Sequence, residues 1–410
     1  MPQTEIDSRR RPLFAGLLAA AAVVAALSPA PASGQTFTKV ADTATAVPGG
    51  SGSFALFADA RAYENGKVAF VAYDSGSGSG VYSFEGGLLR VVADTQTAVP
   101  GTANTFTSFF DVAIDGPFVA FTAGWPGTGG GCAFSGSEGV FGRRFSGGAI
   151  RAVATTDSAG KHCFHGIEFE RRTIAVAGGV DPVDIIHNHS ESVMVIRRVG
   201  SVNTFLDTTT SSPSGGTFVG FDQDLSIRGG GLLFAEIIPN TIGAVAGLYT
   251  VRADGLGPQL VADRATAVPG GSGAFNNFAG ADWDGGEIAF VGRNSLNAAF
   301  LYAGTSPADL RVVVNSSTPV PGEAANFGGV SNPMAYDDGV FVFSGFWLGS
   351  RTGLFTSEAG VVRAILKKND LLDGKLVDSA FCRQGHKDGN EMLIEVRFQD
   401  GSRGLYLVAL

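Results

Sequence analysis

The histidines are the residues of this chain best suited to metal chemistry. Four of the five lie in one stretch, as His162, His165, His187 and His189. Imidazole combined with carboxylate suits Zn²⁺ or a similar divalent ion, and acidic residues lie nearby in the sequence, at Glu168, Asp181, Asp184 and Glu191. The H-x-x-H and H-x-H spacings match no established signature. Two interpretations are open: a metal site, or a solvated histidine-rich loop.

The three cysteines allow one disulfide at most and leave one thiol over. Cys132 lies in a glycine-rich stretch and Cys163 lies beside His162. In an oxidising compartment a disulfide between these two cysteines would hold the glycine-rich loop in place. The alternative is that both stay reduced. We expect Cys382, which follows Phe381, to be a small buried residue.

A ten-residue motif, V-A-D-T-x-T-A-V-P-G, divides the chain into the repeats that must position these residues. Clear copies begin at Val40, Val92 and Val261, and a looser copy begins at Val313. Weaker copies begin at Val153, Phe205 and Ile365. Successive copies start 52 to 61 residues apart. A repeat of this length is typical of the blades of a β-propeller.

Each repeat carries signals for four short strands, named A to D here. A phenylalanine after the motif opens strand A, at Phe54, Phe106, Phe164, Phe218, Phe275, Phe327 and Phe381. Asn-Gly and Asp-Gly turns, the strongest hairpin signals, then lead into a V-A-F-like strand B. A loop and a second tight turn bound strands C and D. Four antiparallel strands in each of seven repeats predict an all-β, seven-bladed β-propeller.

The two ends of the chain are predicted to complete one blade together. A strand of type D, residues 36–42, precedes the first full repeat. The last repeat has strand A from Ala380, strand B at 391–398 and strand C at 403–409, with no strand D. The N-terminal strand should therefore be the fourth strand of the last blade, which leaves no open edge. Residues 33–410 are predicted to form this single domain.

Loop lengths suggest which face of the propeller binds a ligand. Because strand direction alternates, the D–A and B–C loops lie on one face and the A–B and C–D turns on the other. The long B–C loops of blades two to four cover residues 124–138, 179–191 and 237–245. Binding residues concentrate on loops that a rigid scaffold holds, so we expect a ligand on the D–A/B–C face near these blades. The alternative is that these loops are tolerated insertions.

The aspartates of the motif are a second candidate for metal binding, because one per blade suggests a ring of calcium ligands. Aspartate occupies this position in four copies, at Asp42, Asp94, Asp207 and Asp263. The other copies have Thr155, Asn315 and Lys367. Asp and Thr side chains also accept backbone N–H groups within turns. We therefore interpret this position as structural.

Residues 1–32 are predicted to be a signal peptide. Arg9, Arg10 and Arg11 precede an apolar stretch at 13–27, and the A-P-A sequence at 30–32 fits a cleavage site. The apolar stretch is too short for a comfortable membrane span, and either Sec or twin-arginine export fits it. Cleavage would change the net charge from −9 to −10. We expect a secreted or periplasmic monomer that binds neither nucleic acid nor membrane.

The motif copies, together with N-G-K-V-A-F at 65–70, resemble a family of exported bacterial tandem-repeat proteins. That family carries V-A-D-T-x-T-x-V-P-G and N-x-x-G-x-V-A-F repeats. The resemblance covers essentially the whole mature chain and implies a propeller and export. Members often end in a sorting tail that this chain lacks, so surface anchoring is not expected. The family is functionally uncharacterised, so the resemblance assigns no site residue.

The sequence contains no established catalytic motif. G-x-S-x-G, H-E-x-x-H, a P-loop, an EF-hand loop and the sialidase box are all missing. Propeller enzymes assemble sites from scattered loop residues, so an enzyme stays open. We favour a binding module for an extracellular glycan, peptide or protein, with no cofactor beyond the metal considered above. The alternatives are an extracellular hydrolase or lyase that uses the histidines of blade three, and a structural surface or matrix protein.

Overall fold

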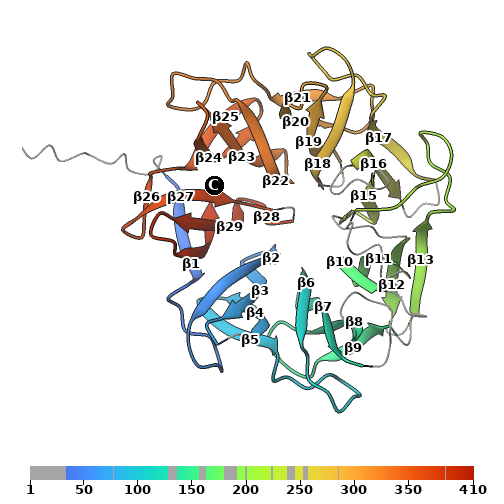
Figure 1. Ribbon diagram of the computed structural model, residues 1–410, viewed down its shortest axis with the longest axis vertical. Helices are drawn as coiled ribbons and strands as arrows, with labels where there is room; N and C mark the ends of the chain where they lie inside the picture. The colour runs from blue at the N-terminus through green and yellow to red at the C-terminus, as the bar shows by residue number, and fades with distance from the viewer. Residues whose placement is uncertain are drawn as a thin grey trace, which may run out of the picture.

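The computed structural model describes residues 34–410 except for ten short gaps. The gaps are 77, 128–135, 157–162, 180–191, 199–200, 223–224, 238–244, 253–256, 285 and 384. The described residues form seven antiparallel sheets around a central axis (Figure 1). The predicted all-β, seven-bladed propeller is confirmed. No helix in the described ranges reaches the length and hydropathy that a membrane crossing requires.

Blades one to three each contain four strands in chain order from the axis outward. Blade one consists of β2 (Phe54–Glu64), β3 (Lys67–Asp74), β4 (Ser79–Glu85) and β5 (Leu88–Asp94). Blade two consists of β6 (Ser108–Asp115), β7 (Phe118–Pro126), β8 (Gly136–Arg144) and β9 (Arg151–Thr155). Blade three consists of β10 (Cys163–Glu170), β11 (Thr173–Gly179), β12 (Ser192–Arg198) and β13 (Ser201–Asp207).

Blades four to six have the same order. Blade four consists of β14 (Ser226–Arg228), β15 (Gly231–Ile237), β16 (Val245–Arg252) and β17 (Gln259–Asp263). Blade five consists of β18 (Phe275–Trp283), β19 (Ile288–Asn294), β20 (Ala299–Gly304) and β21 (Arg311–Val314). Blade six consists of β22 (Gly329–Asp337), β23 (Val340–Trp347), β24 (Arg351–Glu358) and β25 (Val361–Lys367).

Blade seven combines both ends of the chain. β1 (Thr36–Asp42) pairs with β30 (Arg403–Ala409), which pairs with β29 (Glu391–Phe398). The inner strand is in two pieces, β27 (Lys375–Phe381) and β28 (Lys387–Asp388), and both pair with β29. A short strand, β26 (Leu371–Leu372), forms a hairpin with β27. The prediction that the N-terminal strand completes the last blade is confirmed.

The inner strand of blade seven differs from the prediction in its start. β27 begins at Lys375, five residues before Ala380. Val377 pairs with Phe398, the eighth residue of β29, as Phe54 pairs with Asp74, the eighth residue of β3. Val377 is completely buried. The interpretation of Phe381 as the opening residue of strand A is therefore wrong, because Val377 takes that position, 12 residues after the start of the motif copy at Ile365, whereas Phe54 lies 14 residues after Val40.

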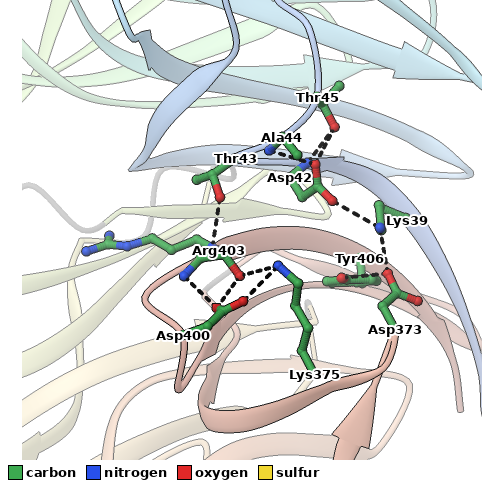
Figure 2. A network of polar contacts seen from close by, with 11 residues as sticks. Lys39, Asp42, Thr43, Ala44, Thr45, Asp373, Lys375, Asp400, Arg403 and Tyr406 are labelled. Atoms are coloured by element: carbon green, nitrogen blue, oxygen red, sulfur yellow. Dashed lines mark hydrogen bonds and ion pairs between the residues drawn. The ribbon is translucent and has the colours of Figure 1, made fainter.

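Polar contacts tie the closing strand to its blade (Figure 2). The ammonium of Lys39 lies 3.0 Å from Asp42 and 2.7 Å from Asp373 in the β26–β27 turn. The hydroxyl of Tyr406 donates to the same Asp373 carboxylate at 2.9 Å. The charged side chains of Lys39, Asp42 and Asp373 are partly exposed, so the ion pairs contribute little stability. The closure depends mainly on the burial of Val40 and Ala41 of β1.

The repeated motif marks a β-bulge in every blade. The strand register shifts by one residue at the first residue of each copy, at Val40, Val92, Val153, Phe205, Val261, Val313 and Ile365. Each bulge ends the outer strand immediately before the chain turns toward the next blade. A bulge bends its strand and increases the local twist. The motif thus directs the chain from one blade into the next.

The aspartate of the motif closes the turn after the bulge. Asp42 Oδ1 accepts hydrogen bonds from the Ala44 N–H at 3.0 Å and the Thr45 hydroxyl at 2.8 Å. The same pattern recurs at Asp94, Asp207, Asp263 and Asn315. In the copy that begins at Ile365, Lys367 donates its N–H to Asp370 at 2.7 Å. The prediction that this position is structural is confirmed at these turns.

The core consists of seven hydrophobic clusters, one between each pair of neighbouring blades. Aromatic rings fill much of this space. In blade one Phe54, Phe57, Phe70 and Tyr82 pack with ring centroids 4.9 to 5.8 Å apart. Aromatic pairs at such distances add stability beyond the area they bury. The strand-opening phenylalanines therefore join the strands of a blade to one another.

We expect Ala41→Asp to lower the free energy of unfolding by about 3 kcal/mol or more, because it buries an unpaired carboxylate at the closing strand. Ala41 is 1% exposed. Thr38→Asp, on the exposed side of the same strand, is the matched control and should change stability little. Urea unfolding of both variants measures the difference. Equal stability of the two variants would contradict closure by β1.

Candidate binding site in the central channel

The predicted histidine site falls largely outside the described residues. His162, His187 and His189 lie in the gaps, and for His165 the backbone of β10 is described but the side chain is not. The metal site therefore stays a prediction. The Cys132–Cys163 disulfide also stays a prediction, because Cys132 and the Cys163 side chain are undescribed. In the part of the chain that the structure describes, no group of three or more His, Cys, Asp or Glu is placed to hold a metal ion.

Cys382 is buried and free, as expected. Its Sγ donates to the Val342 carbonyl at 3.7 Å. Burial raises the pKa of this thiol to about 12, with a further contribution from the charge of Asp282. A thiol held in its protonated form is a poor nucleophile. The structure therefore assigns Cys382 a packing role at the end of β27.

The inner strands surround the central channel, and most of them carry a bulge near the middle (Figure 1). Register shifts occur in β2, β6, β10, β18, β22 and β27. Bulges re-aim side chains. They accompany a change from aromatic core residues, such as Phe54 and Phe57, to charged residues, such as Arg61, nearer the A–B turn.

Carboxylates connect neighbouring blades at the A–B end of the channel. A carboxylate of one blade accepts a hydrogen bond from a backbone N–H in the A–B turn of the next blade at five junctions of the described residues. The pairs are Glu64 with Gly116 (2.5 Å), Asp115 with Arg172 (2.7 Å), Glu170 with Gly229 (3.0 Å), Asp337 with Gly389 (2.9 Å) and Asp388 with Asn65 (2.7 Å). A carboxylate has about four acceptor sites. These groups therefore keep capacity for further donors.

The connection between β27 and β28 crosses the channel. Gly385 donates its N–H to Asp282 of blade five at 3.3 Å. The backbone N–H of Arg383 donates to His386 Nδ1 at 3.1 Å, and His386 Nε2 lies 3.1 Å from the Arg61 carbonyl of blade one. Because Nδ1 accepts, Nε2 carries the proton and donates. Arg383 also forms an ion pair of 2.5 Å with Asp59 of blade one. This connection forms the floor of the A–B end.

Asp282 is the central acceptor of the channel. Its carboxylate accepts backbone N–H groups from Trp283 and Tyr336, both at 2.9 Å, in addition to that of Gly385. Burial raises the pKa of Asp282, while the charge of Arg228 and these hydrogen bonds oppose the rise. For Arg228, burial lowers the pKa, but the surrounding carboxylates, led by Asp282, raise it above its usual value. Asp282 therefore joins blades four to seven.

Arg61 and Glu395 form the second buried pair. The Arg61 guanidinium bonds to the Glu395 carboxylate, and its Nε donates to the Ala58 carbonyl at 2.9 Å. The two side chains are 1% and 2% exposed. Burial lowers the pKa of Arg61, and the carboxylate of Glu395 opposes this shift. The pair joins blade one to blade seven beside the floor.

A pocket of about 120 Å³ opens between this floor and the A–B turns. Arg61, Arg228 and Gly385 line its inner part, and Tyr63 and Phe169 add aromatic surface. Its carboxylate residues are Glu64, Asp115, Glu168, Glu170 and Asp388. The pocket lies on the face opposite to the one on which we predicted a ligand. It can accept a small, polar, hydrogen-bonding group.

The sequence reasoning missed these channel residues. A signal was nevertheless present, because Arg228 stands directly before an A–B turn where Glu64, Asp115, Glu170 and Asp388 stand in other repeats. A single basic residue at a position that is acidic in other blades indicates that this blade uses the position for something other than joining blades.

We expect His386→Gln to make stability less dependent on pH. Burial, with the charges of Arg61 and Arg383, lowers the pKa of His386 to about 3, whereas an unfolded histidine has a pKa of about 6.5. The neutral ring therefore contributes its full stability above pH 6.5 and loses it as the pH falls toward 3, by about 1.4 kcal/mol per pH unit. Urea unfolding from pH 7 to pH 4 should show this extra slope only in the wild type. Parallel curves would show that His386 is not buried as a neutral ring.

We expect Asp282→Asn and Arg228→Met to be coupled. Asp282→Asn should cost about 3 kcal/mol of stability, because the partly buried Arg228 loses its main counter-charge. The double variant should be more stable than the sum of the single effects predicts, by at least about 1 kcal/mol. Chemical unfolding of the four proteins gives the coupling energy. Strict additivity would mean that the two charges do not balance each other.

Residues 4–165 match a protein family of unknown function, DUF7453. This match covers less than half of the chain and includes blades one and two. It agrees with the resemblance to a family without an assigned function. No curated protein matches the chain.

Three solved structures share the fold at low sequence identity. The β-propeller domain of the Trilobed protease from Pyrococcus furiosus has a TM-score of 0.52 and 12% identity, with 87% of this chain and 93% of that domain covered. Pyrococcus horikoshii acylaminoacyl peptidase has a TM-score of 0.50 at 12% identity, with 86% and 50% covered. A puromycin hydrolase mutant has a TM-score of 0.50 at 15% identity, with 84% and 50% covered. The chain thus spans about half of the last two proteins, and these likenesses show the fold alone.

Proposed function

We propose that this protein is an exported β-propeller that acts as a binding module, and that it holds a saccharide at the A–B end of the central channel. The pocket described above carries this proposal. It combines hydrogen-bond acceptors at its rim with the arginines Arg61 and Arg228. A rigid pocket with a few convergent polar groups is the usual form of a small-ligand site.

The chemistry of the lining favours a ligand rich in hydroxyl groups. Hydroxyls donate to carboxylates and accept from guanidinium groups, so one sugar ring uses both kinds of partner. The charges of Arg61 and Arg228 are already balanced by Glu395 and Asp282. Five carboxylates line the pocket beside these two arginines. Anionic ligands are therefore disfavoured, and neutral sugars or amino sugars are favoured.

The D–A/B–C face near blades two to four stays a predicted location for a glycan, peptide or protein ligand. The alternative, an extracellular hydrolase or lyase, depends on the histidines of blade three on the same face. Metal analysis of the purified mature protein, together with the double variant His162→Ala and His187→Ala, tests both. Stoichiometric metal that is lost in the double variant would favour a site on that face. Export depends on residues 1–32, and a cleaved N-terminus in the culture medium or periplasm tests it.

We expect Glu64→Gln to weaken saccharide binding by about tenfold, because a hydrogen bond to a charged acceptor becomes one to a neutral acceptor. Glutamine keeps the oxygen that accepts the Gly116 N–H, so the fold should be retained. Glu85→Gln, at the last residue of β4 before the C–D turn of the same blade, is the matched control. Calorimetry with methyl glycosides of glucose, galactose, glucosamine and glucuronic acid gives the affinities.

The glucuronide should bind most weakly of the four, because the pocket is lined by more carboxylates than arginines. Affinities that are equal in Glu64→Gln and Glu85→Gln would remove the channel as the site. Binding that is lost only in the double histidine variant would place the ligand on the D–A/B–C face.

A further inference from the structure

A second cavity, of about 140 Å³, lies between blades three and four and adjoins the channel pocket. Glu170 and Ile227 line both cavities. The rest of the second cavity is mainly apolar, with Ala175, Val195, Phe205, Leu232 and Val251. Polar groups are confined to the rim near the A–B turns. The charged pocket and the apolar one therefore adjoin, with Glu170 and Ile227 at their boundary.

The cavity is left mainly because one position of the repeat carries a smaller side chain at this junction than at most others. Ile227 pairs with Leu232, and the residues in the same register include the aromatic Tyr63, Trp283 and Tyr336 of blades one, five and six, while blade seven has Lys387 there. These three rings fill the junctions before their own blades. Blade two also has an isoleucine there, Ile114, but Phe145 packs into its cluster. The junction between blades three and four lacks such a ring.

Ala175 also lines the cavity. It points from strand B of blade three toward blade four. The equivalent residues of blades one, two and five are also alanines, Ala69, Ala120 and Ala289, whereas Leu233 and Val342 of blades four and six are larger and fill the next junction. Phe205, the bulge residue of blade three, is 36% exposed. The cavity thus has an accessible aromatic side chain among its lining residues.

We propose that this second cavity binds an apolar substituent, of the size of a phenyl ring, on the saccharide that the channel pocket holds. An apolar cavity of about 150 Å³ accommodates benzene, so the volume fits one ring. The inference rests on the proposed function, because the sugar supplies the polar part in the adjoining pocket. The ligand class is therefore an aryl glycoside or a sugar with a comparable apolar group.

Phenyl β-D-glucopyranoside and methyl β-D-glucopyranoside, with the corresponding galactosides, are the probes. Calorimetry should give the phenyl glycoside at least about tenfold higher affinity, since burial of the ring adds free energy of binding. Ala175→Leu fills the second cavity with a side chain that blade four already carries in this position. It should remove the phenyl preference and leave the affinity for the methyl glycoside within about twofold. Val195→Leu fills the cavity independently and should act in the same direction.

The outcomes separate the two proposals. If methyl and phenyl glycosides bind with equal affinity, the proposal for the second cavity fails and the saccharide proposal stands. The same holds if the preference for the phenyl glycoside survives in both Ala175→Leu and Val195→Leu. If phenol binds, if Ala175→Leu abolishes this binding, and if no glycoside binds, the proposal of a saccharide ligand fails. The ligand class proposed here fails with it. Binding of neither phenol nor a glycoside would overturn both. Glu64→Gln should weaken the phenyl and methyl glycosides equally, because it changes the channel pocket only.

Discussion

The pairing of β1 with β30 is the constraint on which the rest of the structure depends. Each blade has two apolar faces, and a face without a neighbour would leave aromatic rings in water. With β1 in place, the cluster between blades seven and one joins Leu405 and Leu407 to Phe54 and Phe57, so that each of the seven junctions holds a hydrophobic cluster. Closure also sets the diameter of the ring. The inner strands can therefore hold side chains at defined positions around one axis.

That rigidity allows charged groups to be buried in the channel. Asp282, Arg61 and His386 are almost completely buried, and each would be costly alone. Each has partners from other blades: Asp282 accepts from Tyr336 and Gly385, Arg61 bonds to Glu395, and His386 donates to the Arg61 carbonyl. Removing one group would leave another unpaired, so these contacts act as a unit. The ring holds the network in place, and the network connects the blades at their inner edge.

The fold could be predicted from the sequence because its determinants are local and repeated. The turn at Asp42 recurs with the same hydrogen bonds at Asp94 and Asp263, so one pattern counts the blades. The candidate site has no such repetition. Arg61 and Glu395 are 334 positions apart, and only the closed ring brings them together. The error at Phe381 has a different origin, since the opening position of blade seven carries Val377 and not the phenylalanine that marks it in the other blades.

The departures from the repeat carry the functional argument. A residue that every blade shares, such as the motif aspartate, has a role in every blade and is best explained by the fold. Arg228 replaces an acid, and Ile227 beside it replaces a ring that other junctions use for packing. Both changes fall on one three-residue strand, β14: Arg228 lines the channel pocket, and Ile227 lines both this pocket and the second cavity. The change at Ile227 does not improve packing, since a larger residue there would fill the junction. A site for a ligand with a polar and an apolar part explains both substitutions together.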